Sequence, residues 1–337
     1  MDEVAVVGLD LAKNVFQVHG VSADGGVSFR RQLRRGQVLP FFASLPLCLI
    51  GLEACASARH WARELGALGH KVRLMPPAYV KAYVKRGKTD AADAEAIAEA
   101  VTRPTMRFVA VKTKDQQAAL MLHKTRDLLV RQRTMLINAL RGHLGEYGIV
   151  TAQGAVGVQA ALKALRVAQD ELPELARAAL GALARQLEVL GAEIARSEAL
   201  IVAWHRSNET SRRLGTIPGI GPITASALAA SAPDPSLFRS GRQFAAWLGL
   251  TPRAHSSGGK ERQAGISKMG DGYLRRLLVV GATAVIRMAR QRGGSAWIMA
   301  LLARKKPKIA AVALANKTAR IAWALMARKE SYMPGLA

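Results

Sequence analysis

Four acidic residues stand where a folded chain could bring their carboxylates together. Asp10 and Glu53 each follow a short apolar run that is typical of a buried strand. Carboxylates at the ends of two strands of one sheet can converge on one edge, where unpaired charge is costly. Asp90 and Asp93 are three residues apart at the start of a predicted helix, which places both on one helix face.

Such a set would supply hard oxygen ligands for one or two Mg²⁺ ions. Phosphoryl transfer uses these ions to activate the attacking oxygen and to stabilise the leaving one. Each acid also has a simpler interpretation when taken alone, because Asp at a strand end often forms a turn and Asp90 is a good N-cap candidate. The combination is more specific and predicts a catalytic metal site of Asp10, Glu53, Asp90 and Asp93.

A second candidate site is the segment 253–262, RAHSSGGKER, which carries two hydroxyls, a histidine and several cations. A serine among Arg and Lys can attack a phosphodiester while the cations stabilise the charge of the pentavalent transition state. A phosphate-binding loop or a plain linker has the same composition, which taken alone favours that simpler interpretation. His255 could assist proton transfer, although a loop histidine beside serines is more often incidental.

The charge balance predicts a polyanionic partner, most often nucleic acid. The 337 residues include 49 Lys and Arg against 24 Asp and Glu, a formal net charge of +25, which is far more than solubility requires. Residues 211–337 carry a net +17 and the first 210 a net +8, so the C-terminal part is the stronger candidate for binding phosphates. The predicted phosphate contacts are Lys88, Arg253, Lys260, Arg262, Lys268, Arg275 and Arg276.

The segment 217–222, IPGIGP, resembles the turn of a helix-hairpin-helix. In that turn glycines let backbone N–H groups approach a phosphate without reading sequence. Gly219 and Gly221 are therefore further candidates for nucleic-acid binding. A Gly-Ile-Gly turn can also pack helices closely without any ligand.

Several other classes of protein are disfavoured. Cys48 and Cys55 are too few for a disulfide framework or a multi-cysteine zinc site, and they are most simply buried apolar residues. The seven histidines lack zinc-ligand spacing, and no phosphate-binding GxxxxGK[ST] loop occurs, which argues against ATP-driven work. With no leader-like start and no long uncharged apolar run, the chain is predicted to be cytosolic, with no membrane partner.

Apolar periodicity predicts three regions along the chain. An α/β sheet domain comes first, then two long helices form an antiparallel pair or an intermolecular coiled coil, with a plain bundle inside one subunit as the alternative. A mainly helical part with a flexible loop over 252–272 comes last. The predicted strands cover 4–9, 15–21, 27–33, 47–52 and 71–75; the predicted helices cover 58–68, 79–85, 90–101, 116–144 and 172–205, and the long pair is joined through the Gly/Ala-rich stretch 151–158.

The order of the motifs resembles a known family. GLD at 8–10, GLE at 51–53 and KTDAAD at 88–93 look like the Asp-Glu-Asp-Asp set of the insertion-sequence transposases with a RuvC-like (Holliday-junction-resolvase-like) domain. Relatives of that group include the pilin-gene invertases and the bridge-RNA-guided recombinases. The resemblance covers essentially the whole chain, since the C-terminal part also carries IPGIGP at 217–222, GLTP at 249–252, SG at 257–258, ISKMG at 266–270 and LRR at 274–276.

The resemblance implies a division of the chain and a nucleophile. It implies a RuvC-like (RNase H-like) mixed-sheet domain over 1–111, a helical coiled coil over 112–210 and a mainly helical transposase domain over 211–337. In similar enzymes a serine forms a covalent phosphoserine link to DNA, in a composite site with the metal-binding acids. That serine maps onto Ser257, with Ser256 as the alternative; Ser267 is a weaker candidate, better suited to contact phosphate or cap a helix.

The implied activity is excision and insertion of a mobile element by strand exchange. Its partners would be the DNA of the element ends and target, Mg²⁺, an element-encoded structured guide RNA, and further copies of the chain in a dimer or tetramer. The enzyme would be cytoplasmic and nucleoid-associated. Two other hypotheses stay open: a RuvC-like nuclease in which water attacks, and a non-catalytic architectural protein that binds nucleic acid.

Overall fold

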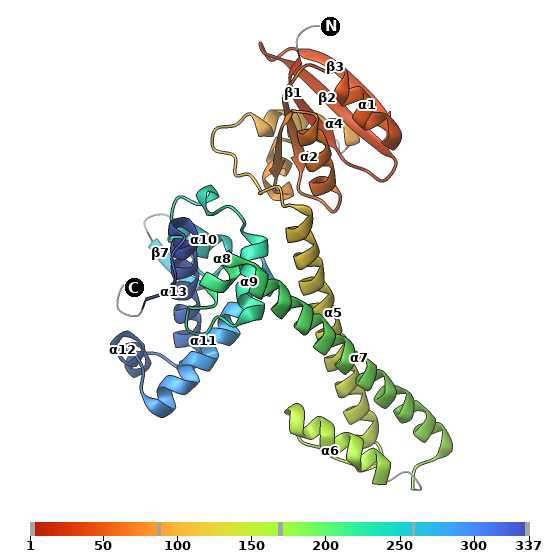
Figure 1. The fold of residues 1–337 in the computed structure, drawn as a ribbon, viewed down its shortest axis with the longest axis vertical. Helices are drawn as coiled ribbons and strands as arrows, with labels where there is room; N and C mark the ends of the chain where they lie inside the picture. The colour runs from red at the N-terminus through yellow and green to blue at the C-terminus, as the bar shows by residue number, and fades with distance from the viewer. Residues whose placement is uncertain (1–3, 86–88, 168–170, 258–259, 334–337) are drawn as a thin grey trace. The chain divides into compact units, whose positions relative to one another are not determined.

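The computed structural model describes residues 4–85, 89–167, 171–257 and 260–333, and the side chains of 155 and 254–264 lie outside that description. The chain divides into two compact units (Figure 1). The N-terminal unit comprises Met1–Lys114 with Ala232–Leu237, and the C-terminal unit comprises Asp115–Ser231 with Phe238–Ala337. The long helices and the C-terminal helices thus share one unit, and the three-part division of the chain stays a prediction.

The N-terminal unit is built on a five-stranded mixed sheet in the order β3-β2-β1-β4-β5. The first three strands of the chain pair antiparallel, while β1, β4 and β5 run parallel. The observed bounds agree with the predicted strands to within two residues, and the mixed α/β architecture is confirmed. The strands are β1 (Val4–Asp10), β2 (Val15–Ser22), β3 (Val27–Arg34), β4 (Leu49–Glu53) and β5 (Lys71–Met75).

Helices cover both faces of this sheet. Alternate strand residues such as Leu9 and Leu52 are fully buried with α1 (Val38–Ala43) and α2 (Ala58–Ala67) on one face. On the other face, α4 (Asp90–Val101) buries its alanines directly against β1, β2 and β4. The sheet is therefore the middle layer of three, as Figure 1 shows.

The predicted helix over 79–85 is much shorter than expected. One turn, α3 (Pro77–Val80), gives way to the 3₁₀ turn η2 (Lys81–Tyr83), and Val84 is extended. Only Val80 of these two elements is buried. Because little apolar packing supports this segment, its helical propensity alone does not extend it.

The C-terminal unit begins with α5 (Lys114–Gly145), α6 (Gly154–Val167) and α7 (Glu174–Ser207), which share one apolar core. Figure 1 shows α5 and α7 running in opposite directions, and the Arg126 guanidinium Nε donates to Glu198 Oε1 at 2.8 Å. The antiparallel pair is thus the arrangement within one chain, and an intermolecular coiled coil stays a prediction.

The predicted linker over 151–158 is wrong in its second half, because α6 begins there. Gly154 and Gly157 are typical of loops, so this segment was not predicted to be helical. A Cβ on Gly157 would overlap the carbonyl oxygen of Ala152, so this glycine allows a close approach of the preceding chain and does not break the helix.

The remaining helices pack around α13 (Pro307–Arg328). It contacts α8 (Glu209–Leu214), α10 (Gly241–Trp247), α11 (Gly272–Arg292) and α12 (Ala296–Arg304). By length and composition α13 is the one helix of the described residues that could span a membrane, and 44% of its most apolar window is buried inside the protein. Its alanine-rich face packs against the neighbouring helices, so α13 is the central helix of this group. The other elements are α9 (Pro222–Ser231) and the short turns η1 (Arg35–Gln37) and η4 (Pro235–Leu237).

The predicted flexible loop over 252–272 is largely a β-hairpin. Strands β6 (Pro252–Ser257) and β7 (Lys260–Ile266) pair antiparallel as a separate two-stranded sheet. The sequence of these strands lacks the apolar alternation by which most hairpins are predicted, which is why a loop was expected.

Candidate metal centre and serine hairpin

Two glycines on neighbouring strands let α4 lie directly on the sheet. Gly8 of β1 pairs with Gly51 of β4 in parallel register. A Cβ on Gly8 would overlap the carbonyl oxygen of Ala94 and lie 2.5 Å from the amide nitrogen of Ala98. Because no side chain fits there, the backbones of strand and helix come into direct contact.

The same strand alternation places the acids. Side chains two residues apart share a face of the sheet, so Asp10 lies on the face of Gly8 and Glu53 on the face of Gly51. The intervening leucines point into the opposite core, where both are fully buried. In each Gly-Leu-acid tripeptide the glycine thus lets α4 approach, the leucine packs in the core, and the acid places a carboxylate at the strand end.

The start of α4 brings two more carboxylates to this strand end. Thr89 is the N-cap, since its Oγ1 accepts a hydrogen bond from the Ala92 amide at 3.2 Å. The N-cap interpretation of Asp90 is therefore wrong: Asp90 is the first helical residue, and its carboxylate is not needed for the cap. Asp90 and Asp93 both lie in the first turn, where the helix dipole favours negative charge.

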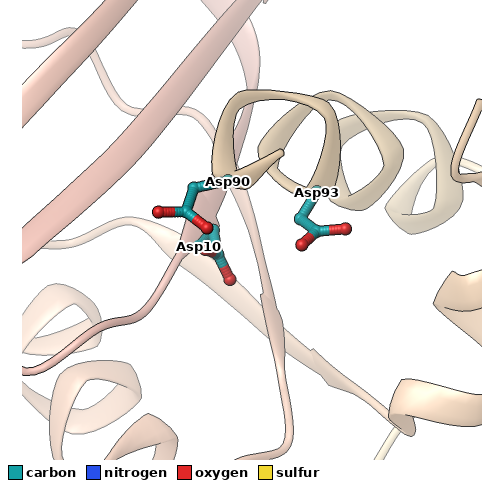
Figure 2. A group of neighbouring side chains, drawn as sticks. All are labelled: Asp10, Asp90 and Asp93. Carbon is teal, nitrogen blue, oxygen red and sulfur yellow. The ribbon is translucent and has the colours of Figure 1, made fainter. Parts of the chain in front are cut away.

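Three acids converge at the end of β1. Asp10, Asp90 and Asp93 each offer a carboxylate oxygen, and these three oxygens all lie within 4.8 Å of one another. Figure 2 shows the strand carboxylate and the two helix carboxylates turned toward the same space. Like charges this close repel unless a cation or proton compensates them.

The fourth predicted acid lies beside this group and outside it. Leu9 pairs with Leu52 across the parallel strands, so Asp10 and Glu53 are the next residues along neighbouring strands. Glu53 is half-buried and is not part of the group of three. Its role as a fourth ligand stays a prediction.

The residues present fit a magnesium ion. Mg²⁺ prefers carboxylate oxygens at about 2.1 Å and keeps several waters, so two protein oxygens on one ion are separated by at most about 4.2 Å. Small side-chain rotations would bring the three carboxylates within that limit. One half-exposed strand residue and two residues of an exposed helix turn also leave room for water and substrate.

The serine candidates lie on the hairpin of the C-terminal unit. Ser257 is the last residue of β6 and pairs with Lys260, the first residue of β7. Ser256 pairs with Glu261. The backbone register therefore places a cationic residue type opposite the predicted nucleophile.

Ser267 does not cap a helix, contrary to one of its predicted roles. Asp271 caps α11, because its Oδ1 accepts from the amides of Tyr273 at 2.8 Å and Leu274 at 3.1 Å. The Ser267 amide instead donates to the Thr251 carbonyl at 2.8 Å, which closes the base of the hairpin.

Sequence comparisons match both units to transposases. Residues 7–149 match a family model of the DEDD type described as a transposase, and residues 211–297 match one described as the transposase IS116/IS110/IS902 family. The chain is 52% identical over 333 residues to a "Probable family 20 transposase" of Pseudomonas aeruginosa, covering 98% of each chain. The chain belongs to the IS116/IS110/IS902 family of transposases.

Two further relatives extend the agreement over the length of the transposase. A "Putative transposase y4pF/y4sB" of Sinorhizobium fredii is 50% identical over 336 residues, 98% of this chain and 86% of the relative. The "Transposase for insertion sequence element IS1111A" of Coxiella burnetii is 41% identical over 348 residues, 99% of this chain and 93% of the relative. Transposases of this family cleave and rejoin DNA, and their DEDD domain is RuvC-like.

The glycines of the predicted helix-hairpin-helix turn have different environments in the transposase. Gly219 has φ +85°, and its Cβ would lie 2.9 Å from Val285 Cγ2. A Cβ on Gly281 of α11 would overlap the carbonyl oxygen of Gly219. Packing against α11 therefore suffices to explain Gly219, whereas Gly221 is exposed with no such neighbour and stays a predicted phosphate contact.

Two predicted phosphate-binding arginines already have protein partners. Arg275 Nη1 donates to the carbonyl oxygens of Leu248 at 3.1 Å and Met269 at 3.0 Å. Arg276 forms an ion pair with Asp127 of α5. A phosphate would have to compete with these contacts, and the role of both arginines as phosphate contacts stays a prediction.

Of the other predicted phosphate contacts, the structure describes the side chains of some and not of others. Lys268 is exposed and has the left-handed φ of +57°, and Arg253 Nη2 donates to the Ser267 carbonyl at 3.4 Å. Lys88 and the side chains of Lys260 and Arg262 lie outside the described residues. The N-cap role of Thr89 was not predicted, although a threonine directly before an acidic helix start is a recognisable N-cap signal.

Proposed function

We propose that this transposase excises and inserts its element by metal-assisted strand cleavage and exchange through a phosphoserine intermediate. The observation that carries the proposal is the convergence of Asp10, Asp90 and Asp93 at one strand end. A group of three carboxylates with exposed access is suited to hold Mg²⁺ against a phosphodiester. Glu53, on the neighbouring strand, would complete the set.

The chemistry divides between the ion and the serine hairpin. When bound, Mg²⁺ would supply stabilisation of charge on the phosphoryl oxygens. The Ser257 oxygen would form a new bond to phosphorus while the bond to one sugar oxygen breaks; the serine proton is removed, and the leaving oxygen is protonated. One phosphoester replaces another, so the step needs no ATP.

Rejoining reverses this exchange. The sugar hydroxyl of a second strand would attack the phosphoserine and release Ser257 unchanged. Cationic residues of the hairpin, Lys260 and Arg262 among them, would stabilise the pentavalent transition state. The proposed partners are DNA, a structured guide RNA and further copies of the chain, and the net charge of +25 supports both nucleic-acid partners.

The metal site is tested with the Asp93→Asn variant. We expect loss of Mg²⁺-dependent strand cleavage by at least about 100-fold, because one ligand charge and its orientation are lost. Asp24→Asn is the matched control, since Asp24 is an exposed turn residue bonded to Ser22. Calorimetric titration with Mg²⁺ should show weakened binding for Asp93→Asn alone, and unchanged binding and cleavage would contradict the assignment.

The serine is tested by trapping. Incubation with a nicked element-end substrate should yield a covalent protein–DNA adduct in the wild type and in Ser256→Ala. Ser257→Ala should yield none while retaining Mg²⁺ binding. Cleavage by Ser257→Ala at the wild-type rate would instead support a nuclease in which water attacks.

The guide RNA is tested by purifying the protein from cells that carry its element and sequencing the RNA that accompanies it. A discrete species encoded by the element supports the proposal. Its absence, with DNA binding intact, indicates that the protein alone recognises its target.

A further inference from the structure

A groove of about 1520 Å³ runs along α13 in the C-terminal unit. Helix α13 forms one wall, and the start of α10 and the base of the hairpin form the other, through Gly241, Leu250 and Ile266. Trp297 of α12 and residues 330–333 complete the lining. Both α10 and α12 pack against α13 (Figure 1).

Most of the lining of this groove is apolar or aromatic. Ile309, Val312 and Ile321 line it from α13. Trp297 is 40% exposed, and Trp323 and Tyr332 are half-buried along the same groove. Three aromatic side chains thus line one open groove, and such side chains can stack on the planar groups of a ligand.

The rim of the groove is basic. Among the side chains that the structure describes, one acidic residue, Glu330, and five cations line the groove. None of the five forms a salt bridge with any side chain that the structure describes. Lys317 Nζ lies 4.8 Å from the centre of the Trp297 ring, so an ammonium group and an aromatic face are held together. The cations are Arg242, Lys308, Lys317, Arg320 and Arg328.

We propose that this groove binds an unpaired stretch of DNA strand. A duplex presents phosphates but hides its base faces, so it could contact the cations of the groove and not its aromatic side chains. An unpaired strand presents both, and each base stacked on an aromatic ring contributes about 1–3 kcal/mol. The volume also exceeds the roughly 300–1,000 Å³ of small-molecule sites, which suits a segment of polymer.

We choose DNA as the occupant of the groove because transposases of this family act on DNA. Cleavage and rejoining of strands expose unpaired DNA, and in this respect the inference rests on the proposed function. An acidic peptide would satisfy the cations but has no regular succession of planar groups for the rings of Trp297, Trp323 and Tyr332. The groove would hold the unpaired strand while its end is exchanged.

The test measures binding of a fluorescently labelled 15-residue oligothymidylate to the full chain in the presence of EDTA. Trp297→Ala should weaken binding about 5- to 100-fold, whereas Trp297→Phe should stay within about threefold of wild type. Arg320→Ala and Lys317→Ala should each lower the salt slope by about 0.7. Tyr147→Ala and Arg290→Ala are matched controls, because both residues are exposed and lie outside the groove.

Location is read by photocross-linking with bromodeoxyuridine. Cross-links in peptides that contain Trp297, Trp323 or Tyr332 support the groove, and cross-links confined to other elements overturn it. Equal effects of Trp297→Ala on single-stranded DNA and on a duplex of the same sequence also overturn it. Tighter binding of polyglutamate or of the matching RNA would reassign the groove to an acidic protein or to RNA.

The groove and the metal site can be tested independently of each other. Binding is measured without divalent ions, so Asp93→Asn should bind the oligonucleotide as the wild type does. Trp297→Ala should in turn retain Mg²⁺ affinity. Thermal unfolding of each variant establishes that the exposed Trp297 was replaced without loss of the fold.

Discussion

A single buried histidine joins three helices of the C-terminal unit. His123 of α5 is 2% exposed, with Nδ1 3.1 Å from the Tyr273 hydroxyl and Nε2 3.0 Å from Ser226 Oγ. Ser226 donates its only proton to backbone carbonyls, including that of Pro222 at 2.7 Å. Ser226 must therefore accept from Nε2–H, which leaves Nδ1 to accept from Tyr273.

Burial, with a smaller contribution from the nearby charge of Arg126, lowers the pKa of His123 to about 4. In the unfolded chain its pKa is about 6.5. Between these values the unfolded state binds more protons than the native state, so the free energy of unfolding falls as pH drops from 6.5 to 4. We expect a loss of up to about 3 kcal/mol in the C-terminal unit.

Denaturant unfolding at pH 7, 5.5 and 4.5 measures this dependence. His123→Gln should lose this part of it, because Gln does not titrate, whereas His143→Gln should keep it, since His143 is exposed on the same helix. Identical pH profiles for wild type and His123→Gln would contradict the neutral, buried histidine.

At this scale the sequence identified what residue type and spacing encode. The acids were recognisable because each stands at the end of an apolar run or three residues from another acid. The partners of His123 were not, because Ser226 and Tyr273 are 103 and 150 residues away. Neither were the carbonyl contacts of Arg275, which depend on how two loops meet.

Among the elements, α4 determines whether the metal site exists. Its alanines and the glycines of β1 and β4 bring the first turn to Asp10. Gly8→Ala should displace α4, because the new methyl group would overlap the Ala94 carbonyl. We expect a destabilisation of about 1–3 kcal/mol and a loss of Mg²⁺ affinity of at least about tenfold.

Gly51→Ala is the matched comparison for the effect of Gly8→Ala. Its Cβ would lie 2.9 Å from Val101 Cβ, 3.1 Å from Ile97 Cγ2 and 3.2 Å from the Ile97 carbonyl oxygen, whereas the Cβ at Gly8 would overlap a carbonyl oxygen. We therefore expect a smaller effect on both stability and Mg²⁺ affinity, measured by thermal unfolding and calorimetry. An equal or larger effect of Gly51→Ala would contradict the proposed seating of α4.

Strands and long helices were predictable because their apolar periodicity is strong. The hairpin β6–β7 was not, because its sequence shows no alternation of apolar and polar residues. Helix α6 was missed because Gly154 and Gly157 imitate a linker. Gly157 allows a close approach of the preceding chain, which only the position of the Ala152 backbone reveals.

For the whole molecule, an apolar stripe on α5 bears on assembly. Met121, Leu128 and Met135 recur every seven residues and are 62%, 48% and 69% exposed. A heptad stripe left outside the core of one chain favours contact with another helix. We expect a dimer or tetramer whose mass by light scattering falls in the double variant Leu128→Glu/Met135→Glu.

Thr134→Glu is the control for assembly, since Thr134 is exposed on α5 and lies outside the stripe. It should leave the mass unchanged. An unchanged mass in the double variant would show that any assembly uses another surface.

The close approach of Asp10, Asp90 and Asp93 also makes the thermal stability of the N-terminal unit depend on the Mg²⁺ concentration. An ion bound only by the folded unit raises its unfolding free energy by about 2.7 kcal/mol at 100 times the dissociation constant. Without the ion, mutual repulsion of the three charges lowers it. Asp93→Asn should therefore melt higher than the wild type in EDTA and lower in saturating Mg²⁺, a reversal that calorimetry can detect. The three carboxylates proposed to bind Mg²⁺ for catalysis would therefore make this unit less stable at low Mg²⁺ concentration than at high concentration.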